Sequence, residues 1–284
     1  MSCDRDHHYA TVFQMSDYSL GHSAAEQERL QRQAGYLRGI TESIWRSAGI
    51  APGLQVLDVG CGVGDTTFLA ADLVGPGGFV IGMDRSADAI ATARQRAETD
   101  GRRNVLFVQG ELGSPVPGRG PFDAVVGRYV LVHQRDIPAA LRSLHALVRP
   151  GGFVAFHELE LDLRFVSDPS SDLAQRVYFW LREACRLGGM QLNVVSQMPR
   201  YFCEAGLGWP ETAIHPLVGC GADSFGPGYV VSTLSSIAPL LVKAGVATEE
   251  ELDLDTLEAR LRESCANGAA SMAQINSGVW VRRM

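Results

Sequence analysis

The sequence predicts an α/β fold built on a mostly parallel, seven-stranded sheet with an antiparallel edge strand. Short apolar runs alternate with helical segments between residues 56 and 156, as in chains whose parallel strands are joined by helices. These runs are apolar at successive positions, which is typical of parallel strands covered on both faces. Two further strand-like runs near residues 212 and 278 are separated by helical segments, and this arrangement suits an antiparallel edge.

The predicted elements follow one another in a regular order. Apolar side chains at helical spacing predict one or two amphipathic helices over about residues 23–48, which Ala51-Pro52-Gly53 ends. Strands are expected at residues 56–59, 79–83, 105–108, 122–126 and 153–156, with helices at 66–74, 88–99 and 137–148. The last third is expected to be mainly helical at 172–187 and 226–266, with late strands at 212–214 and 278–281.

Composition narrows the class of protein. The 284 residues include 25 Lys and Arg against 32 Asp and Glu, a formal net charge of −7. Such a chain lacks the positive surface that nucleic acids and anionic membranes attract, so neither is an expected partner. No apolar run reaches the roughly 18–20 residues of a membrane-spanning helix, and the N-terminus has no apolar signal core. The six cysteines lack Cys-x-x-Cys spacing, which favours a reduced, cytoplasmic chain; homo-oligomer formation is left open.

A glycine-rich turn between the first predicted strand and the next helix is the most informative stretch. Glycines there let the backbone approach a bound nucleoside closely. The spacing is Gly60-x-Gly62-x-Gly64, whereas the dinucleotide fingerprint is Gly-x-Gly-x-x-Gly and would need a glycine in place of Asp65. Asp58 stands two residues before the first glycine, where a pyrophosphate would be poorly accommodated. A ligand with an ammonium group and no phosphate suits this turn better.

With this turn, the chain resembles the class I S-adenosylmethionine-dependent methyltransferases, in particular the small-molecule branch of ubiquinone and natural-product enzymes. The run Leu57-Asp58-Val59-Gly60-Cys61-Gly62-Val63-Gly64 is similar to the first motif of that family. Further matches follow in order at Gly82-Met83-Asp84, Gly110-Glu111-Leu112, Phe122-Asp123-Ala124-Val125 and Leu147-Val148-Arg149-Pro150-Gly151-Gly152. The resemblance covers roughly residues 15–160 and implies a Rossmann-like core that binds S-adenosylmethionine and releases S-adenosylhomocysteine.

The resemblance also implies roles for single residues. Asp84 would hold the ribose hydroxyls, with Arg85 beside it, although Asp84 could instead cap the following helix. The turn Gly110-Glu111-Leu112 would meet the adenine; the family more often has Asp at the place of Glu111, which could also be a solvated loop acid. Asp58 would polarise the turn and the methionine end of the cofactor. Cys61 is interpreted as a small filler of the turn and not as a nucleophile.

The loop after the fourth predicted strand and the N-terminal segment supply further candidates. The loop lacks the Asn/Asp-Pro-Pro-aromatic motif of nucleic-acid amino methyltransferases. Arg128 could bind the cofactor carboxylate or an acidic substrate, or form a surface ion pair. His133 could act as a general base near neutral pH, or serve only in packing or capping. Tyr18 and His22 resemble the N-terminal lid of many members, which closes over the cofactor.

The end of the fifth predicted strand carries His157 and Glu158, which should face opposite ways if the strand continues. Either could supply a base, or a metal site together with His133. The catechol-type metal pattern of acids after strands four and five is absent because Arg128 follows strand four, so no catalytic metal is predicted. Seven aromatic and Met side chains suggest an apolar acceptor pocket, although core packing would explain each one alone: Tyr178, Trp180, Met190, Met198, Tyr201, Phe202 and Trp209.

These observations together predict three regions and one main activity. Residues 1–50 form a helical lid, residues 51–160 the S-adenosylmethionine-binding core, and residues 161–284 a helical cap with the acceptor region and the last two strands. The expected reaction is methyl transfer to O, C or N of a small, apolar, secondary-metabolite-like molecule. An S-adenosylmethionine-binding enzyme that assists cyclisation or rearrangement is the alternative, because such motifs specify the cofactor and not the acceptor. A nicotinamide oxidoreductase is disfavoured by the glycine spacing.

Overall fold

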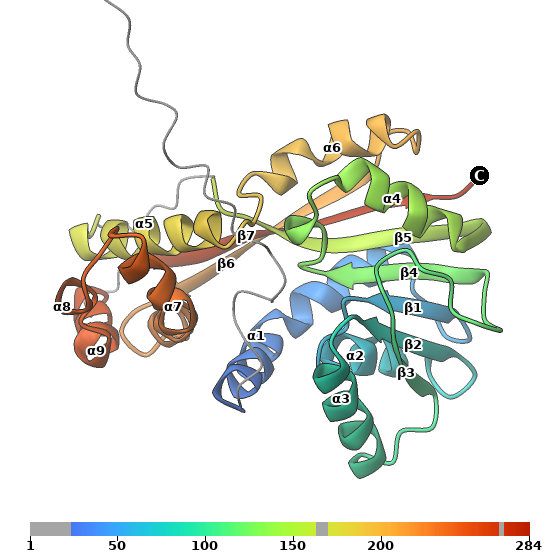
Figure 1. Ribbon diagram of the computed structural model, residues 1–284, viewed down its shortest axis with the longest axis horizontal. Helices are drawn as coiled ribbons and strands as arrows, with labels where there is room; N and C mark the ends of the chain where they lie inside the picture. The colour runs from blue at the N-terminus through green and yellow to red at the C-terminus, as the bar shows by residue number, and fades with distance from the viewer. Residues whose placement is uncertain (1–23, 163–169, 267–269) are drawn as a thin grey trace, which may run out of the picture.

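Strands in the described residues of the computed structural model (24–162, 170–266 and 270–284) form one seven-stranded sheet in the order β3-β2-β1-β4-β5-β7-β6 (Figure 1). The strands are β1 (Gln55–Val59), β2 (Phe79–Asp84), β3 (Val105–Gln109), β4 (Phe122–Arg128), β5 (Val148–Glu160), β6 (Glu211–Cys220) and β7 (Ala270–Arg282). The first five run parallel, and β7 pairs antiparallel with both β5 and β6. The predicted fold class is therefore confirmed.

Strand order reverses at β1, which pairs with β2 on one side and with β4 on the other. Loops from neighbouring strands diverge at such a reversal and leave room for a ligand outside the carboxyl ends of the strands. The glycine-rich turn follows β1 and the His133 loop follows β4. Both therefore lie at the edge of the sheet where a ligand is expected.

Helices cover both faces of the sheet. One face carries α1 (Ala24–Ala48), α2 (Asp65–Val74) and α3 (Ala87–Thr99), and the other carries α4 (Ile137–Ala146) and α6 (Val194–Glu204), as Figure 1 shows. Ile44 and Trp45 of α1 are fully buried on the first face, and Phe156 and Phe202 on the second. The C-terminal half of α1 thus belongs to the hydrophobic core on the first face of the sheet. None of the helices in the described part of the chain is long and apolar enough to cross a membrane.

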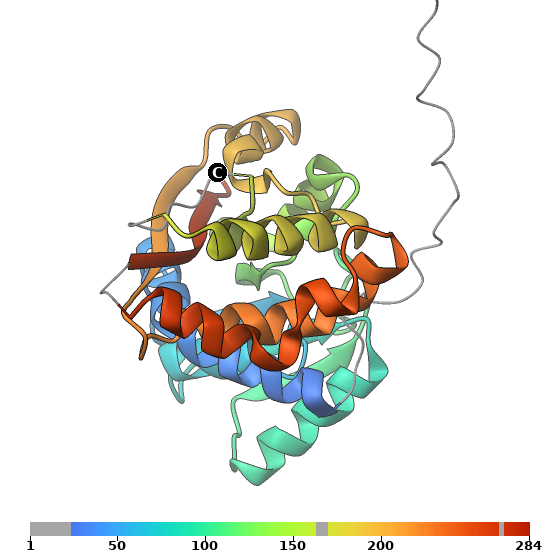
Figure 2. The same cartoon turned by 90° about the vertical axis from the view of Figure 1, so that its left-hand side faces the viewer.

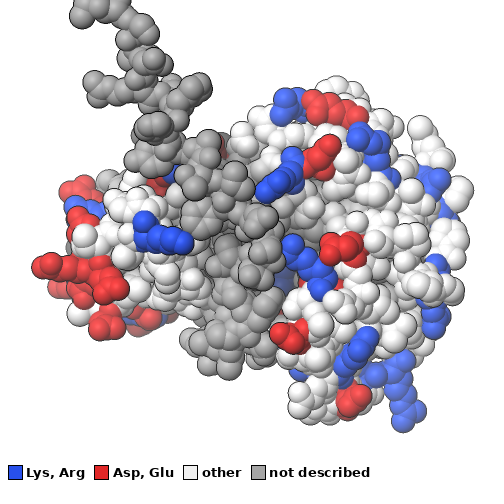
Figure 3. Space-filling view, viewed as in Figure 1, with Lys and Arg blue, Asp and Glu red and all other residues white. Residues whose placement is uncertain are grey.

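A helical cap lies beyond the carboxyl end of β5. It contains α5 (Asp172–Leu187), α7 (Gly226–Lys243), α8 (Glu249–Leu252) and α9 (Leu254–Ser264). These helices have a hydrophobic core of their own, which includes Trp180 and Leu234. Figure 2 shows them in front of the sheet, with α1 in contact with α7. Acidic side chains gather over α8 at this end of the molecule (Figure 3), so part of the acid excess lies on the cap.

The main differences from the predicted elements lie after residue 146. β5, β6 and β7 are longer than expected, because the antiparallel ladder from Phe153–Arg282 to Glu160–Ile275 extends the strands beyond their apolar runs. Helix α6 was not predicted. Pro199 lies inside it, and a proline at such a position in a sequence indicates the end of a helix and not its interior. The four strands and three helices from β1 to β4 and from α2 to α4 lie close to the predicted positions.

Gly278 of β7 allows α1 to pack against the sheet, and this contact can be tested. A Cβ on Gly278 would lie 2.6 Å from Cγ2 of the fully buried Ile44. Gly278→Ala should lower the free energy of unfolding by about 1–3 kcal/mol, because the buried Ile44 side chain would have to shift to admit the added methyl group. Gly39→Ala is the control: Gly39 is exposed on α1 with open space around it, and the exchange should stabilise by roughly 0.5–1 kcal/mol. Urea denaturation that ranks Gly278→Ala as stable as wild type would contradict the contact.

Candidate ligand site at the carboxyl ends of the strands

The glycine turn after β1 is closely packed at both ends and open in the middle. Gly60, Gly62 and Gly64 have φ values of +64°, +53° and +97°, which favour glycine. A Cβ on Gly60 would lie 2.8 Å from Cγ2 of Val130, and one on Gly64 would lie 2.9 Å from Cζ of Phe107. A Cβ on Gly62 would meet nothing within 4 Å. A ligand can therefore approach the backbone closely at Gly62.

Asp84 at the end of β2 faces this open position. Its Oδ2 accepts the backbone N–H of Gly62 at 2.9 Å, and its Oδ1 accepts that of Ser86 at 2.9 Å. Ser86, not Asp84, caps α3, because its hydroxyl accepts the N–H of Ala89. The half-buried carboxylate has about four acceptor sites in all. Its remaining lone pairs can accept from vicinal hydroxyl groups of a ligand.

Asp58 lies beneath the turn and is fully buried. Its Oδ2 accepts from the hydroxyls of Thr66 and Thr67, each at 2.7 Å, so it ties the start of α2 to β1. Burial raises the pKa of Asp58 to about 6, although the two hydroxyls oppose the rise. Its buried Oδ1 has no hydrogen-bond partner in the described chain. Sequence reasoning missed Thr66 and Thr67, because two hydroxyls at the start of a predicted helix are the only signal they offer.

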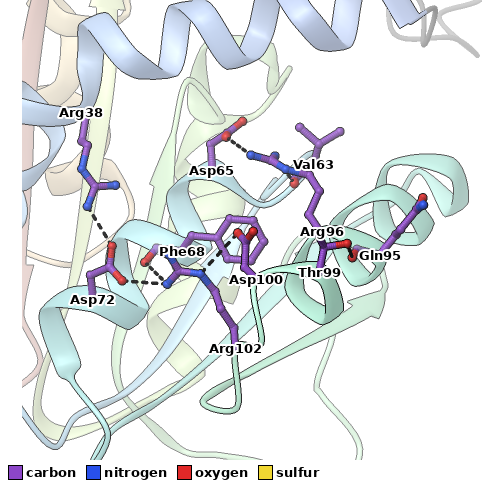
Figure 4. A network of polar contacts seen from close by, with 10 residues as sticks. All are labelled: Arg38, Val63, Asp65, Phe68, Asp72, Gln95, Arg96, Thr99, Asp100 and Arg102. Carbon is purple, nitrogen blue, oxygen red and sulfur yellow. Dashed lines mark hydrogen bonds and ion pairs between the residues drawn. The ribbon is translucent and has the colours of Figure 1, made fainter.

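Arg96 of α3 holds the far side of the turn (Figure 4). Its guanidinium donates to the carbonyl of Val63 at 2.6 Å and to the carboxylate of Asp65 at 2.8 Å. It also lies over the ring of Phe68, 5.2 Å from the centroid. The Asp65 carboxylate occupies the first turn of α2, where a pyrophosphate would otherwise bind. A ligand without phosphate therefore fits this turn best. Sequence reasoning missed Arg96, because only the tertiary fold brings α3 to the turn.

Cys61 and the turn after β3 complete the surroundings of Gly62. Burial raises the pKa of the Cys61 thiol, so it is uncharged at neutral pH and fills space within the turn. The N–H of Gly110 donates to the carbonyl of Asp84 at 3.0 Å, which brings the third strand end beside the second. Glu111 is exposed and Leu112 packs against the main core.

Two further candidate residues, Arg128 and His133, lie at the same edge. Arg128 ends β4 half-buried, and in the described residues its guanidinium has no hydrogen bond or ion pair, while its charge lowers the pKa of Asp58. His133 ends the 3-10 turn η1 (Leu131–His133). Burial, with help from the charge of Arg85, lowers the pKa of His133 to about 4. His133 is therefore neutral at pH 7. Tyr18 and His22 lie outside the described residues.

His157 lies level with the end of β4, but its side chain is fully buried inside the fold. Its Nδ1 is 2.9 Å from the Thr41 hydroxyl of α1, and its Nε2 is 3.0 Å from Oδ1 of Asn276 on β7. Since the Asn276 amide nitrogen faces the carbonyl of His215, Oδ1 is the acceptor for Nε2–H. The Thr41 hydroxyl, which donates to the carbonyl of Leu37 at 3.0 Å, is the polar neighbour of Nδ1. Burial lowers the pKa of His157 to about 3. A catalytic role stays a prediction that this geometry does not favour.

Glu158 faces the opposite way, as the strand alternation predicted. Its fully buried carboxylate accepts N–H groups from Val130, Leu131 and Val132. Burial raises the pKa of Glu158 to about 7, against the effect of these three bonds. Its catalytic role likewise stays a prediction without support from the geometry. No group of three or more His, Cys, Asp or Glu residues in the described part of the chain could hold a metal ion.

The seven aromatic and Met side chains of the expected acceptor pocket do not gather in one place. Trp180 lies in the core of the cap, whereas Met198 and Phe202 lie in the core between α6 and the sheet. Trp209 is 78% exposed. The hydroxyl of Tyr178 donates to the carbonyl of Leu161. Tyr201 and Met190 are half-buried beside the main core. The expectation of one pocket built from this set is therefore wrong, because the residues face two separate cores and the surface.

Known proteins that resemble this chain include several methyltransferases. Residues 50–185 match a family model described as a methyltransferase domain. Demethylmenaquinone methyltransferase of Lactococcus lactis subsp. lactis is 34% identical over 116 residues, which cover 39% of this chain and 46% of that protein. The 2-phytyl-1,4-naphtoquinone methyltransferase of Synechococcus elongatus is 38% identical over 137 residues, which cover 47% and 55%. The chain thus spans about half the length of the curated relatives it matches. The crystal structure of the YcgJ protein of Bacillus subtilis shares the fold, with a TM-score of 0.55 at 16% identity over 87% of this chain and 99% of that chain.

The buried histidine predicts how stability depends on pH. The pKa of His157 is about 3 in the folded chain, against an ordinary value of 6.5. The unfolded chain therefore binds one proton more between these values, so stability is full above pH 6.5 and falls as the pH is lowered. Relative to His157→Gln, wild type should lose about 1.4 kcal/mol per pH unit below pH 6. Urea denaturation of both proteins at several pH values measures this difference. A difference that stays constant from pH 7.5 to pH 5 would contradict the neutral, buried imidazole.

Proposed function

We propose that this chain, whose residues 50–185 match a methyltransferase domain model, transfers a methyl group from S-adenosylmethionine to O, C or N of a small metabolite. The observation that carries the proposal is the glycine turn that is open only at Gly62, with the Asp84 carboxylate beside it. The first turn of α2 already holds the carboxylate of Asp65, paired with Arg96. A nucleoside with a positively charged amino-acid chain suits these groups, and a dinucleotide does not.

The cofactor supplies an electrophilic methyl group on its sulfonium. We place its ribose at Asp84, whose carboxylate can accept from both hydroxyls. The turn Gly110-Glu111-Leu112, which is bonded to the backbone of Asp84, would line the adenine. Arg128 would bind the carboxylate of the methionine part, since its guanidinium has no other anion in the described residues. Cys61 would fill space within the turn, and Asp58 would support it from beneath.

His133 would face the acceptor. It is neutral at pH 7 because its pKa is lowered to about 4, so its imidazole can accept a hydrogen bond from a hydroxyl. A base this weak removes only a proton that is lost easily. Phenols and enols are more acidic than aliphatic alcohols, so quinol-type acceptors should be assayed first. Alignment of the acceptor with the methyl group would supply the rest of the rate enhancement.

The remaining predictions fit this activity. We propose that the cap helices, within residues 161–284, cover the acceptor side, since α5 follows the carboxyl end of β5. Of the expected lid, residues 1–50, the C-terminal half of α1 is instead part of the hydrophobic core. A net charge of −7 supports a small molecule over a nucleic acid as the acceptor. Cysteines without a disulfide in the described residues support a reducing, cytoplasmic location.

Calorimetry with S-adenosylhomocysteine and NADH tests the cofactor. S-adenosylhomocysteine should bind and NADH should not. Tight binding of NADH without binding of S-adenosylhomocysteine would contradict the proposal. A panel of phenols, quinols and amines then tests the reaction through release of S-adenosylhomocysteine. If the chain converts an acceptor to a cyclised product without that release, a cofactor-assisted rearrangement replaces methyl transfer.

Asp84→Ala tests the ribose contact. The loss of hydrogen bonds from two hydroxyls to a carboxylate should weaken S-adenosylhomocysteine binding by about 2–4 kcal/mol, roughly 30- to 1000-fold in Kd. Asp88→Ala is the matched control, because Asp88 is exposed on the first turn of α3; its Kd should stay close to wild type. Equal affinity of Asp84→Ala and wild type, measured on folded proteins, would remove the ribose role.

A further inference from the structure

Glu158 has a fully buried carboxylate for which the methyl-transfer proposal has no chemical use. Its Oε1 accepts the N–H groups of Val130 at 2.9 Å and Leu131 at 2.8 Å, and its Oε2 accepts that of Val132 at 3.2 Å. A buried polar group without hydrogen bonds is costly, so the carboxylate and these three amides require one another. Glu158 therefore fixes the backbone of residues 130–132 from the side of the sheet.

Gln191, in the loop after α5, holds the same turn from the side of the cap. Its backbone N–H donates to the carbonyl of Val132 at 2.9 Å, and its side-chain amide donates to the carbonyl of Gln134. The hydroxyl of Tyr201 donates to Oε1 of Gln191 at 3.1 Å, which sets the amide so that its nitrogen faces Gln134. The backbone N–H groups of the turn thus donate to Glu158, and the backbone carbonyls of the turn accept from Gln191.

The entry to this turn is strained, and the turn itself is packed on the donor side. Tyr129 has a φ of +55°, a conformation that a non-glycine residue adopts only where its surroundings impose it. Its N–H donates to the carbonyl of His157 at 2.8 Å, and its hydroxyl donates to Asn276 at 2.6 Å. The next residue, Val130, packs against Gly60 of the glycine turn. The positive φ, the hydrogen bonds and the packing contact together constrain the position of this short turn.

We propose that Glu158 and Gln191 are positioning residues, which hold residues 130–134 and thereby set the imidazole of His133 at the carboxyl edge of the sheet. Neither touches donor or acceptor; both act through His133. The proposal rests on the proposed function, since methyl transfer gives His133 its task. A merely structural pair would change the stability of the fold and leave the surroundings of His133 as they are.

The Hε1 NMR signal of His133, assigned by its absence in His133→Gln, reports on these surroundings without any ligand. In wild type the pKa of His133 should be about 4. In Gln191→Ala it should rise by about one unit or more toward 6.5, because a looser turn lets water reach the imidazole. Glu158→Gln should act in the same direction where it folds. Gln175→Ala, an exposed glutamine on α5, is the matched control and should leave the pKa of His133 unchanged.

Titration with S-adenosylhomocysteine separates this proposal from the proposed function. Gln191→Ala should bind it with a Kd within about threefold of wild type, while the ligand-induced shift of the His133 signal falls to less than about half. An unchanged pKa and an unchanged shift in Gln191→Ala would overturn the positioning role. Failure of wild type to bind S-adenosylhomocysteine would instead contradict the proposed function. The pH titration would still decide whether Gln191 sets the place of His133.

Discussion

The side chain of Val130 joins the two turns on which the proposed reaction depends. Val59 of β1 and Gly127 of β4 are paired in register, so the chain leaves both strands at adjacent positions. Added Cβ atoms on Gly60 and Gly127 would lie 2.8 and 3.0 Å from Cγ2 of Val130. Only glycine leaves room for this valine between the two turns. The turn that would hold the donor and the turn that carries His133 are therefore one packed unit.

Three buried polar residues fix the elements around this unit. Asp58 binds the hydroxyls at the start of α2, His157 binds Thr41 of α1, and Glu158 binds the amides after β4. Burial of a polar group without partners costs roughly 2–7 kcal/mol. Each of these three contacts therefore favours the one position of its helix or loop in which the hydrogen bonds form. The residues left half-buried at the edge, Asp84 and Arg128 among them, are those that can meet a ligand. The buried polar residues thus hold the site in place, whereas the half-buried ones are accessible to a ligand.

The sequence was sufficient where local pattern decides the structure. The glycine spacing and an acid at a strand end were enough to single out the turn and Asp84, which the structure joins by a hydrogen bond at Gly62. It was insufficient where distant segments meet. The apolar run of β5 ends at Phe156, but pairing of His157 with Gly278 carries the strand further. A histidine expected to be open at the edge is therefore level with the end of β4 but buried between α1 and β7. Arg96 was missed for the same reason, since nothing local to α3 reveals that its guanidinium reaches the carbonyl of Val63.

A crystal structure with S-adenosylhomocysteine bound tests the central claim most directly, because it shows the donor site and the place of His133 together. The account predicts ribose hydroxyls within hydrogen-bond distance of Asp84, the nucleoside against Gly62, and the sulfur on the side of the sheet edge where His133 lies. It also predicts Val130 still packed between Gly60 and Gly127. Ligand bound elsewhere, or bound here with its sulfur turned away from residues 130–134, would contradict it.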